Sequence, residues 1–178
     1  LHEKVRPLAH PALDKLCHSY SGYFDVVRHE EPKGHLVAEA GLHIHSEKYV
    51  LVKAAKLWEA DNNEYVYIFS VPVLTKEIFE QCREQARVDG LQRIEPGPNH
   101  MCSYITAIFL CDTCEPDALR ALRRTRIYKS FKLAFHGWMD YHTGVAELST
   151  GKTAANGSGR STAQLLKTTL FKNMKEGS

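Results

Sequence analysis

Apolar and polar residues alternate along residues 23–71 with a period of two, a pattern that predicts β-strands. Short turn segments such as Ser46–Glu47 separate the strands from one another. The predicted strands cover residues 23–29, 35–45, 48–59 and 64–71. Because the connections are short, we expect consecutive strands to pair as an antiparallel β-meander.

Apolar residues at helical spacing flank this region on both sides. Pro11 suits the first turn of one helix, and Thr75 can cap a second helix that would end at Gly90. The remaining predicted elements are a buried strand at 101–110, a helix opened by Pro116, a strand at 131–141, a hairpin of 145–148 with 152–155, and a last helix with Ser161 and Gln164 at capping-box spacing.

This order of elements is typical of an α+β fold. We expect the antiparallel β-meander to extend into one twisted mixed sheet, with helices packed mainly on one face. A chain of 178 residues with 43% hydrophobic content is long enough to bury one sizeable core, so we expect a single domain over residues 1–178. The segment 156–161, rich in Gly and Ser, is expected to be a flexible connector to the last helix.

Side-chain alternation divides the predicted sheet into an apolar face and a face that carries His, Lys, Trp and Tyr. If the turn at Ser46–Glu47 sets the register, Lys56 meets Tyr67 across the next turn. Aromatic rings there would supply stacking area, and charged side chains would orient a polar ligand. The candidate ligand-binding residues are Glu39, His43, Lys56, Trp58, Tyr65 and Tyr67. The alternative is that helices cover this face and that Glu39 and Lys56 form an ordinary ion pair.

A second candidate site consists of metal ligands on the predicted strand at 131–141. His136, Asp140 and His142 share one face of that strand, and imidazole with carboxylate suits zinc or another divalent metal. Alternation along one strand brings neighbouring ligands only to about 7 Å, so a second strand must cooperate. A divalent metal is therefore not the favoured cofactor.

The five cysteines are an odd number, which argues against a disulfide framework. Cys111 and Cys114 form a C-x-x-C sequence between a predicted strand and a predicted helix. A helix N-terminus can lower a thiol pKa, which would suit a redox role. The alternative is two incidental thiols.

Charge is distributed unevenly, since residues 115–178 carry eleven Lys or Arg against five Asp or Glu. This asymmetry is compatible with an anionic partner such as a phosphate or a nucleic acid, and equally with a solvated basic surface. The candidate anion-binding residues are Arg120, Arg123, Arg124 and Arg160. The order helix, meander, helix, strand also occurs in restriction-type nucleases, yet an acidic-x-Lys sequence is found only at Glu31–Lys33, in a predicted turn.

Several segments resemble an uncharacterised bacterial domain family over most of residues 23–155. The segments are Glu47–Leu51, Ala55–Ala60, Asn63–Val66 and His136–Trp138. The resemblance implies a bacterial cytoplasmic protein, and it carries neither an activity nor site residues.

The sequence contains no catalytic motif in its required context, so it leaves enzymatic activity undecided. No apolar run approaches the roughly 18 residues that span a bilayer, and we expect a soluble, cytoplasmic protein without a membrane partner. We expect a non-catalytic binding or interaction domain whose His/Lys/aromatic face takes a small ligand or a protein. The alternative is a metal-dependent hydrolase or nuclease acting on phosphate esters. Exposed sheet edges would also permit a homo-oligomer.

Overall fold

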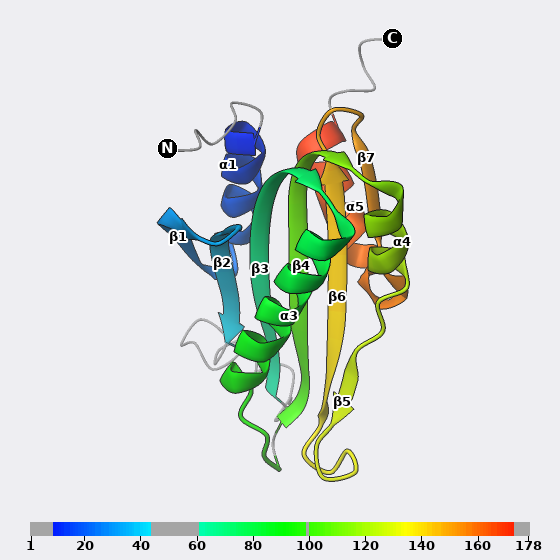
Figure 1. Cartoon of the computed structure of the whole chain (residues 1–178). Coiled ribbons are helices and arrows are strands. Elements are labelled where there is room, and N and C mark those ends of the chain that lie inside the picture. The colour runs from blue at the N-terminus through cyan, green and yellow to red at the C-terminus, as the bar shows by residue number, and fades with distance from the viewer. Residues whose placement is uncertain (1–8, 44–60, 99, 173–178) are drawn as a thin grey trace.

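The computed structural model describes residues 9–43, 61–98 and 100–172 of the chain. Helices and strands follow one another in a mixed order along these residues (Figure 1). They are α1 (Ala9–Tyr20), β1 (Asp25–Lys33), β2 (Leu36–His43), β3 (Asp61–Leu74), α3 (Lys76–Arg93), β4 (His100–Cys114), α4 (Pro116–Arg123), β5 (Tyr128–Ser130), β6 (Trp138–Glu147), β7 (Lys152–Ala155), the 3-10 helix η1 (Gly157–Gly159) and α5 (Arg160–Phe171).

The strands form one seven-stranded sheet in the order β1-β2-β3-β4-β6-β5, with β7 also paired to β6. β1, β2 and β3 are antiparallel, whereas β3, β4 and β6 run parallel to one another. Helices α3 and α4 form the two crossovers between the parallel strands, and both lie on the face turned toward the viewer in Figure 1. The prediction of an α+β fold with a mixed sheet is therefore confirmed.

Helices cover both faces of the sheet, so the expectation that they pack mainly on one face is wrong. On the front face of Figure 1, a hydrophobic cluster joins the sheet to α3 and α4 through residues that include Tyr67, Phe69, Phe79, Phe109, Leu122 and Tyr141. On the rear face, a second cluster joins the sheet to α1 and α5 through residues that include Leu13, Leu16, Ala38, Ile68, Ile108 and Leu166. Parallel strands such as β4 are apolar on both sides, and each side must be shielded from water.

The pairing of β2 differs from the predicted meander. β2 pairs directly with β3, which places Glu39 opposite Tyr67. The other edge of β2 is paired with β1, and the other edge of β3 is paired with β4. On β3, Tyr67 lies between Glu39 and Ala107, whereas its predicted partner Lys56 lies outside the described residues. The predicted strand 48–59 itself lies outside the described residues.

Helix α3 begins as predicted and ends later than predicted. The Thr75 side chain accepts a hydrogen bond from the Ile78 amide at 3.2 Å, and the helix continues through Gly90 to Arg93. Gly90 is buried where α3 crosses β4, and a Cβ atom there would lie only 2.7 Å from Ile105. Gly90 therefore permits close packing of helix on sheet and does not terminate the helix.

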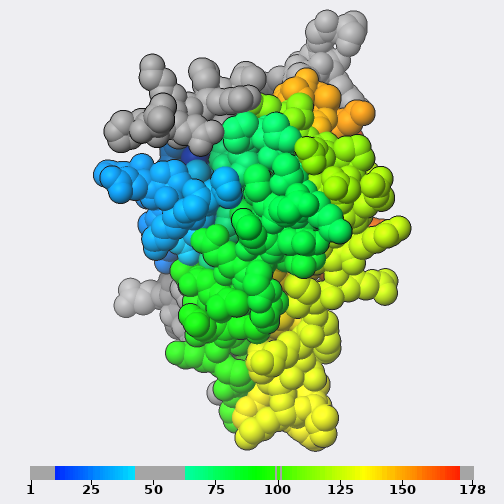
Figure 2. All heavy atoms as spheres, viewed as in Figure 1, coloured from blue at the N-terminus to red at the C-terminus, as the bar shows by residue number. Residues whose placement is uncertain are grey.

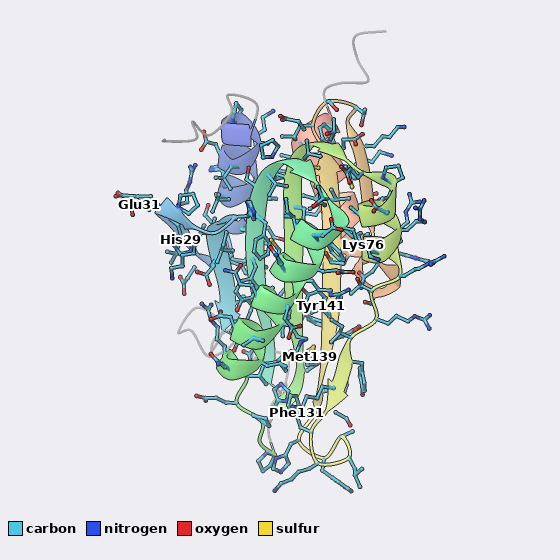
Figure 3. The ribbon with its side chains drawn as sticks, in the orientation of Figure 1. His29, Glu31, Lys76, Phe131, Met139 and Tyr141 are labelled. Carbon is cyan, nitrogen blue, oxygen red and sulfur yellow. The ribbon has the colours of Figure 1, made fainter. Side chains whose placement is uncertain are left out.

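The region before β6 is a loop where a strand was predicted. Lys132, Leu133 and Ala134 have φ angles of 46°, 52° and 72°, which no β-strand allows. This loop, which begins at Phe131, forms one end of the molecule, and β6 starts only at Trp138 (Figure 3). The alternation of apolar and polar residues in the loop before Trp138 therefore does not reflect a β-strand.

The segment expected to be a flexible connector begins with a buried side chain. The Asn156 carboxamide donates to the carbonyl groups of Tyr141 and Thr125 at 2.9 and 3.1 Å, and accepts from the Thr143 amide at 3.0 Å. α5 follows directly after η1, and Gly159 occupies its N-cap without a side-chain hydrogen bond. The predicted capping box at Ser161 is therefore wrong.

None of the helices in the described ranges is long and apolar enough to cross a membrane.

Candidate functional site

The predicted ligand-binding face is covered by α3. Glu39, Tyr65 and Tyr67 do lie on one face of the sheet, the front face, as their alternation implies. Tyr67 is only 1% exposed, however, because α3 packs across the middle of this face (Figure 2). His43 is the last residue of β2, while Lys56 and Trp58 lie outside the described residues. The front face therefore presents no open aromatic platform at these tyrosines.

Glu39 belongs to an ion network at the edge of the front face. Its carboxylate contacts Nε2 of His29 at 2.7 Å and Nη2 of Arg93 at 2.6 Å. Arg93 also pairs with Asp89 at 3.1 Å, and Asp89 accepts a hydrogen bond from the Tyr67 hydroxyl at 2.5 Å. His29 lies on β1 at the sheet edge (Figure 3), so the network ties β1, β2 and α3 together. Glu39 therefore has an internal ion-pair role with His29 and Arg93, and its predicted partner Lys56 lies outside the described residues.

The predicted metal ligands do not converge. Asp140 and His142 are close on β6, with 3.8 Å between Oδ2 and Nε2. His136 lies in the preceding loop, where its carbonyl group accepts a hydrogen bond from Nδ1 of His100 at 2.6 Å. Within residues 9–43, 61–98 and 100–172, no three His, Cys, Asp or Glu side chains are arranged to hold a metal ion. The described residues thus show no preformed three-ligand site, and metal binding by His136, Asp140 and His142 stays a prediction.

Asp140 and His142 instead belong to a cluster of polar residues on the rear face. Strand register places Glu64, Tyr104 and Asp140 side by side on β3, β4 and β6. The next row contains Thr106 beside His142. These five residues, Glu64, Tyr104, Thr106, Asp140 and His142, are called the rear-face polar cluster below. They lie on parallel strands whose neighbouring rear-face positions are apolar, including Val66, Ile68 and Ile108.

Two contacts organise the cluster. Thr106 Oγ1 donates a hydrogen bond to Glu64 Oε1 at 2.9 Å. The rings of Tyr104 and His142 stack, with centroids 4.8 Å apart and an angle of 25° between their planes. Tyr104 thus lies at the centre of the cluster, with a carboxylate on each neighbouring strand.

Burial shifts the pKa values of the cluster toward neutral forms. It raises the pKa of Glu64 above 4.5, while the hydrogen bond from Thr106 opposes this rise. Burial lowers the pKa of His142 below 6.5, against the attraction of the Asp140 carboxylate. A hydrogen bond with Cys102, followed by burial, raises the pKa of Tyr104 to about 12. At neutral pH the imidazole is therefore uncharged and the phenol is protonated.

Hydrogen-bonding capacity remains available in this cluster. Among the described residues, Asp140 Oδ1 accepts a hydrogen bond only from the amide of the adjacent Tyr141, and only Thr106 donates to Glu64. Neither nitrogen of His142 hydrogen-bonds to another described residue, since Asp140 is 3.8 Å away. Glu64, Asp140 and His142 are each half-buried.

Sequence reasoning found two of the five residues of this cluster. Asp140 and His142 were recognised as an alternating pair, but Glu64, Tyr104 and Thr106 were assigned only to strands. The sequence did contain a signal for Tyr104 and Thr106, because they are polar residues at alternate positions within an apolar run.

The predicted anion-binding residues are all exposed and lie on α4, its C-cap and the first turn of α5. They are Arg120, Arg123, Arg124 and Arg160. Their role stays a prediction.

Comparison with known proteins identifies the family of the chain. No curated protein and no solved structure matches it. One family, described as a domain of unknown function (DUF8052), matches residues 9–168, from the first residue of α1 into α5. The resemblance to an uncharacterised family is thereby confirmed. The chain is a member of the DUF8052 family of domains of unknown function.

Proposed function

We propose that this chain is a binding domain and that the rear-face polar cluster is its ligand site. One observation carries the proposal. Glu64 and His142 are titratable groups with pKa values shifted by burial, and they retain hydrogen-bonding capacity that no described residue uses. Half-buried groups of this kind, grouped on one surface, are typical of binding sites.

A purely structural role accounts less well for these residues. An ionised carboxylate in a partly buried position costs free energy unless a cation or several hydrogen bonds offset the loss of water. Glu64 receives one hydrogen bond, and no described Lys or Arg acts on its pKa. By contrast, Glu39 on the front face has both His29 and Arg93 as partners. A valine at position 64 would stabilise the fold more, so the carboxylate indicates a role in binding.

The chemistry of the cluster favours a small, planar organic cation with N–H donors. The Tyr104 and His142 rings supply flat surface for stacking, and the Glu64 and Asp140 carboxylates supply acceptors and negative charge. Neutral His142 can accept a hydrogen bond through one ring nitrogen. Amidinium, guanidinium and protonated heterocyclic groups combine these properties.

Benzamidine and benzoate test this proposal, because they share a shape and differ in charge. Calorimetric titration should show benzamidine binding and much weaker benzoate binding. Glu64→Gln and Asp140→Asn should each weaken benzamidine by about tenfold, the loss of one charge-assisted hydrogen bond. Glu80→Gln, on the exposed side of α3, is the matched control and should bind as the wild type does. Equal affinity for the two probes, or no effect of the rear-face variants, would contradict the proposal.

A metal-dependent hydrolase acting on phosphate esters is the second candidate. The order α1, three antiparallel strands, α3 and a parallel strand favours it, because restriction-type nucleases share this order. Elemental analysis of protein purified without chelator separates the two functions. Near one equivalent of zinc or manganese that is lost in His142→Ala would favour the hydrolase. Substoichiometric metal that added zinc or manganese cannot restore would exclude it.

A further inference from the structure

The loop between β5 and β6, residues 131–137, presents large apolar side chains to water at one end of the molecule (Figure 1). Leu133 is 88% exposed and Phe135 is 81% exposed, the two highest values among the large apolar residues of the described ranges. Tyr128, at the start of β5, is 62% exposed. Single exposed apolar residues are ordinary on a protein surface, whereas a group of them on one protruding segment is typical of an interaction site.

Contacts at its base hold the loop in one conformation. The Phe131 amide donates to the Gly137 carbonyl at 2.9 Å, and the His136 amide donates to the Phe131 carbonyl at 3.1 Å. Phe131 packs against the front-face core and lies edge-on to the His100 ring, with centroids 5.7 Å apart. Nδ1 of the buried His100 also hydrogen-bonds to the His136 carbonyl at 2.6 Å. The base of the loop is therefore fixed to β4.

Three consecutive residues of the loop have a strained backbone. Lys132, Leu133 and Ala134 all have positive φ angles, which residues with a Cβ atom rarely adopt. Strain of this kind persists where the surrounding structure enforces it, and it concentrates at functional sites. The contacts at the base of the loop enforce it here. Leu133 and Phe135 are therefore held in water by a preformed loop.

Positive charge accompanies the apolar residues. Arg126, Lys129 and Lys132 are all exposed, and none of them forms an ion pair with another residue of the described ranges. Lys129 Nζ lies over the Phe131 ring, 5.6 Å from its centroid. From residue 118 to residue 139 the sequence contains six Lys or Arg and no Asp or Glu. Asp140, the first carboxylate after the loop, belongs to the rear-face polar cluster.

We propose that the 131–137 loop binds the surface of a membrane that contains anionic phospholipids. Leu133 and Phe135 enter the boundary between head groups and acyl chains, where their side chains leave water. Lys129 and Lys132 lie at the level of the phosphates, with their aliphatic stems beside the apolar side chains. Tyr128 suits the same level, because its ring is apolar and its hydroxyl is polar. A loop of this kind needs no segment that crosses the bilayer, so the proposal departs from the expectation of no membrane partner.

The size and the charge of this end favour a lipid surface over a protein partner. A stable protein interface buries about 800 Å² on each partner, from roughly 20–30 residues. Here the exposed large apolar side chains are those of Tyr128, Leu133 and Phe135, at the narrow lower end of the molecule in Figure 2. A bilayer can surround a protruding loop on all sides, whereas a protein must offer a matching cavity. Cations without ion pairs also match the negative potential of anionic head groups.

Co-sedimentation with phospholipid vesicles tests the proposal. The wild type should bind vesicles of about two parts phosphatidylcholine to one part phosphatidylserine, and should bind pure phosphatidylcholine at least about tenfold less. Replacing Leu133 and Phe135 together by Ser should lower binding to the anionic vesicles at least about tenfold, because the apolar anchor is lost. Val27→Ser combined with Val88→Ser changes exposed apolar residues on β1 and α3, and this control should bind as the wild type does.

A second pair of variants tests the charge. Replacing Lys129 and Lys132 together by Gln should weaken binding to the anionic vesicles by about fivefold for each lysine. Replacing Lys152 and Lys167 by Gln makes the same change in net charge and is the matched control. Lys129 and Lys152 pair with positions of β6 that are eight residues apart, about 26 Å at 3.3 Å per residue. This distance exceeds the Debye length of about 10 Å at 0.1 M salt, so the control should bind nearly as the wild type does.

The same experiments can overturn the proposal. All of the replaced side chains are exposed, so the variants keep the fold. No vesicle binding by the wild type would overturn the membrane partner, and equal binding to the two kinds of vesicle would overturn the role of anionic lipid. Unchanged binding after replacement of Leu133 and Phe135 would overturn the role of the loop. A dimer that is lost in that variant, without vesicle binding by the wild type, would assign the loop to a second copy of the chain instead.

Discussion

Replacing Gly90 by Ala sets two opposite effects against each other. Gly90 lies inside α3, where Ala has a helix propensity about 1 kcal/mol more favourable. A Cβ atom at this position would, however, lie 2.7 Å from Cγ1 and from Cδ1 of Ile105, and 3.1 Å from Cγ2. Carbon atoms pack at about 3.5–4.0 Å, so helix and strand would have to separate by roughly 0.8 Å. Ile105 is fully buried in the front-face core and has little room to move.

The steric effect should decide the sign of the change. Overpacking a filled core costs about 1–3 kcal/mol. Because several Ile105 atoms are involved, we expect a cost near the upper end of that range. After the gain in helix propensity, Gly90→Ala should lower the free energy of unfolding by about 1–2 kcal/mol. If Gly90 served only to end the helix, Gly90→Ala would cause no clash with Ile105. The loss of backbone freedom at position 90 would then be the only effect of the substitution.

Urea unfolding followed by far-UV circular dichroism measures this change, and Ile105→Ala supplies the control. The single Ile105→Ala variant should lose about 2–5 kcal/mol. In that background the clashing atoms are absent, so Gly90→Ala should become neutral or stabilising by up to about 1 kcal/mol. A higher urea midpoint for Gly90→Ala in the wild-type background would refute this reasoning.

Four further predictions concern other parts of the molecule and use the same urea assay. Asn156→Ala should cost about 2–4 kcal/mol, because it removes the hydrogen-bond partner of the Thr143 amide and of the Thr125 carbonyl, although Ser158 Oγ still donates to the Tyr141 carbonyl; a loss below 0.5 kcal/mol would argue against this network. Ala134→Gly should gain about 0.5–1 kcal/mol by relieving a φ of 72°, and no gain would mean that the loop relaxes freely. Because the folded-state pKa of Glu64 is raised, its contribution to stability should grow as pH falls from neutral toward 4.5, and this growth should vanish in Glu64→Gln. Because the folded-state pKa of His142 is lowered, its contribution should be lost as pH falls below 6.5, and His142→Gln should abolish that loss.

Local patterns predicted elements whose signals lie within one turn of chain. The helical spacing after residue 9 and the hydroxyl of Thr75 led to α1 and to the start of α3, and both are present. The apolar run at 101–110 led to a buried strand, which became β4. These predictions succeeded because capping, helical periodicity and continuous hydrophobicity each depend on neighbouring residues alone.

Predictions that required a partner strand or helix failed or stayed incomplete. Glu39 could be assigned to a face, but its partners His29 and Arg93 come from β1 and α3. The pairing of β2 with β3 likewise could not be read from turn residues, because register is a property of two strands. Gly90 has the same appearance in a sequence whether it ends a helix or admits a close contact.

The sequence by itself determined the α+β class, most helices and strands, and the reactive groups: an Asp-x-His pair at 140 and 142 and a C-x-x-C pair at 111 and 114. Only the tertiary structure decided which of these groups meet. Parallel register on β3, β4 and β6 brings Glu64 and Tyr104 beside Asp140, and it leaves His136 in a separate loop. The physical reason is that sequence periodicity specifies the direction of a side chain relative to its own backbone, whereas a site requires several backbones at about 4.8 Å spacing in one particular register.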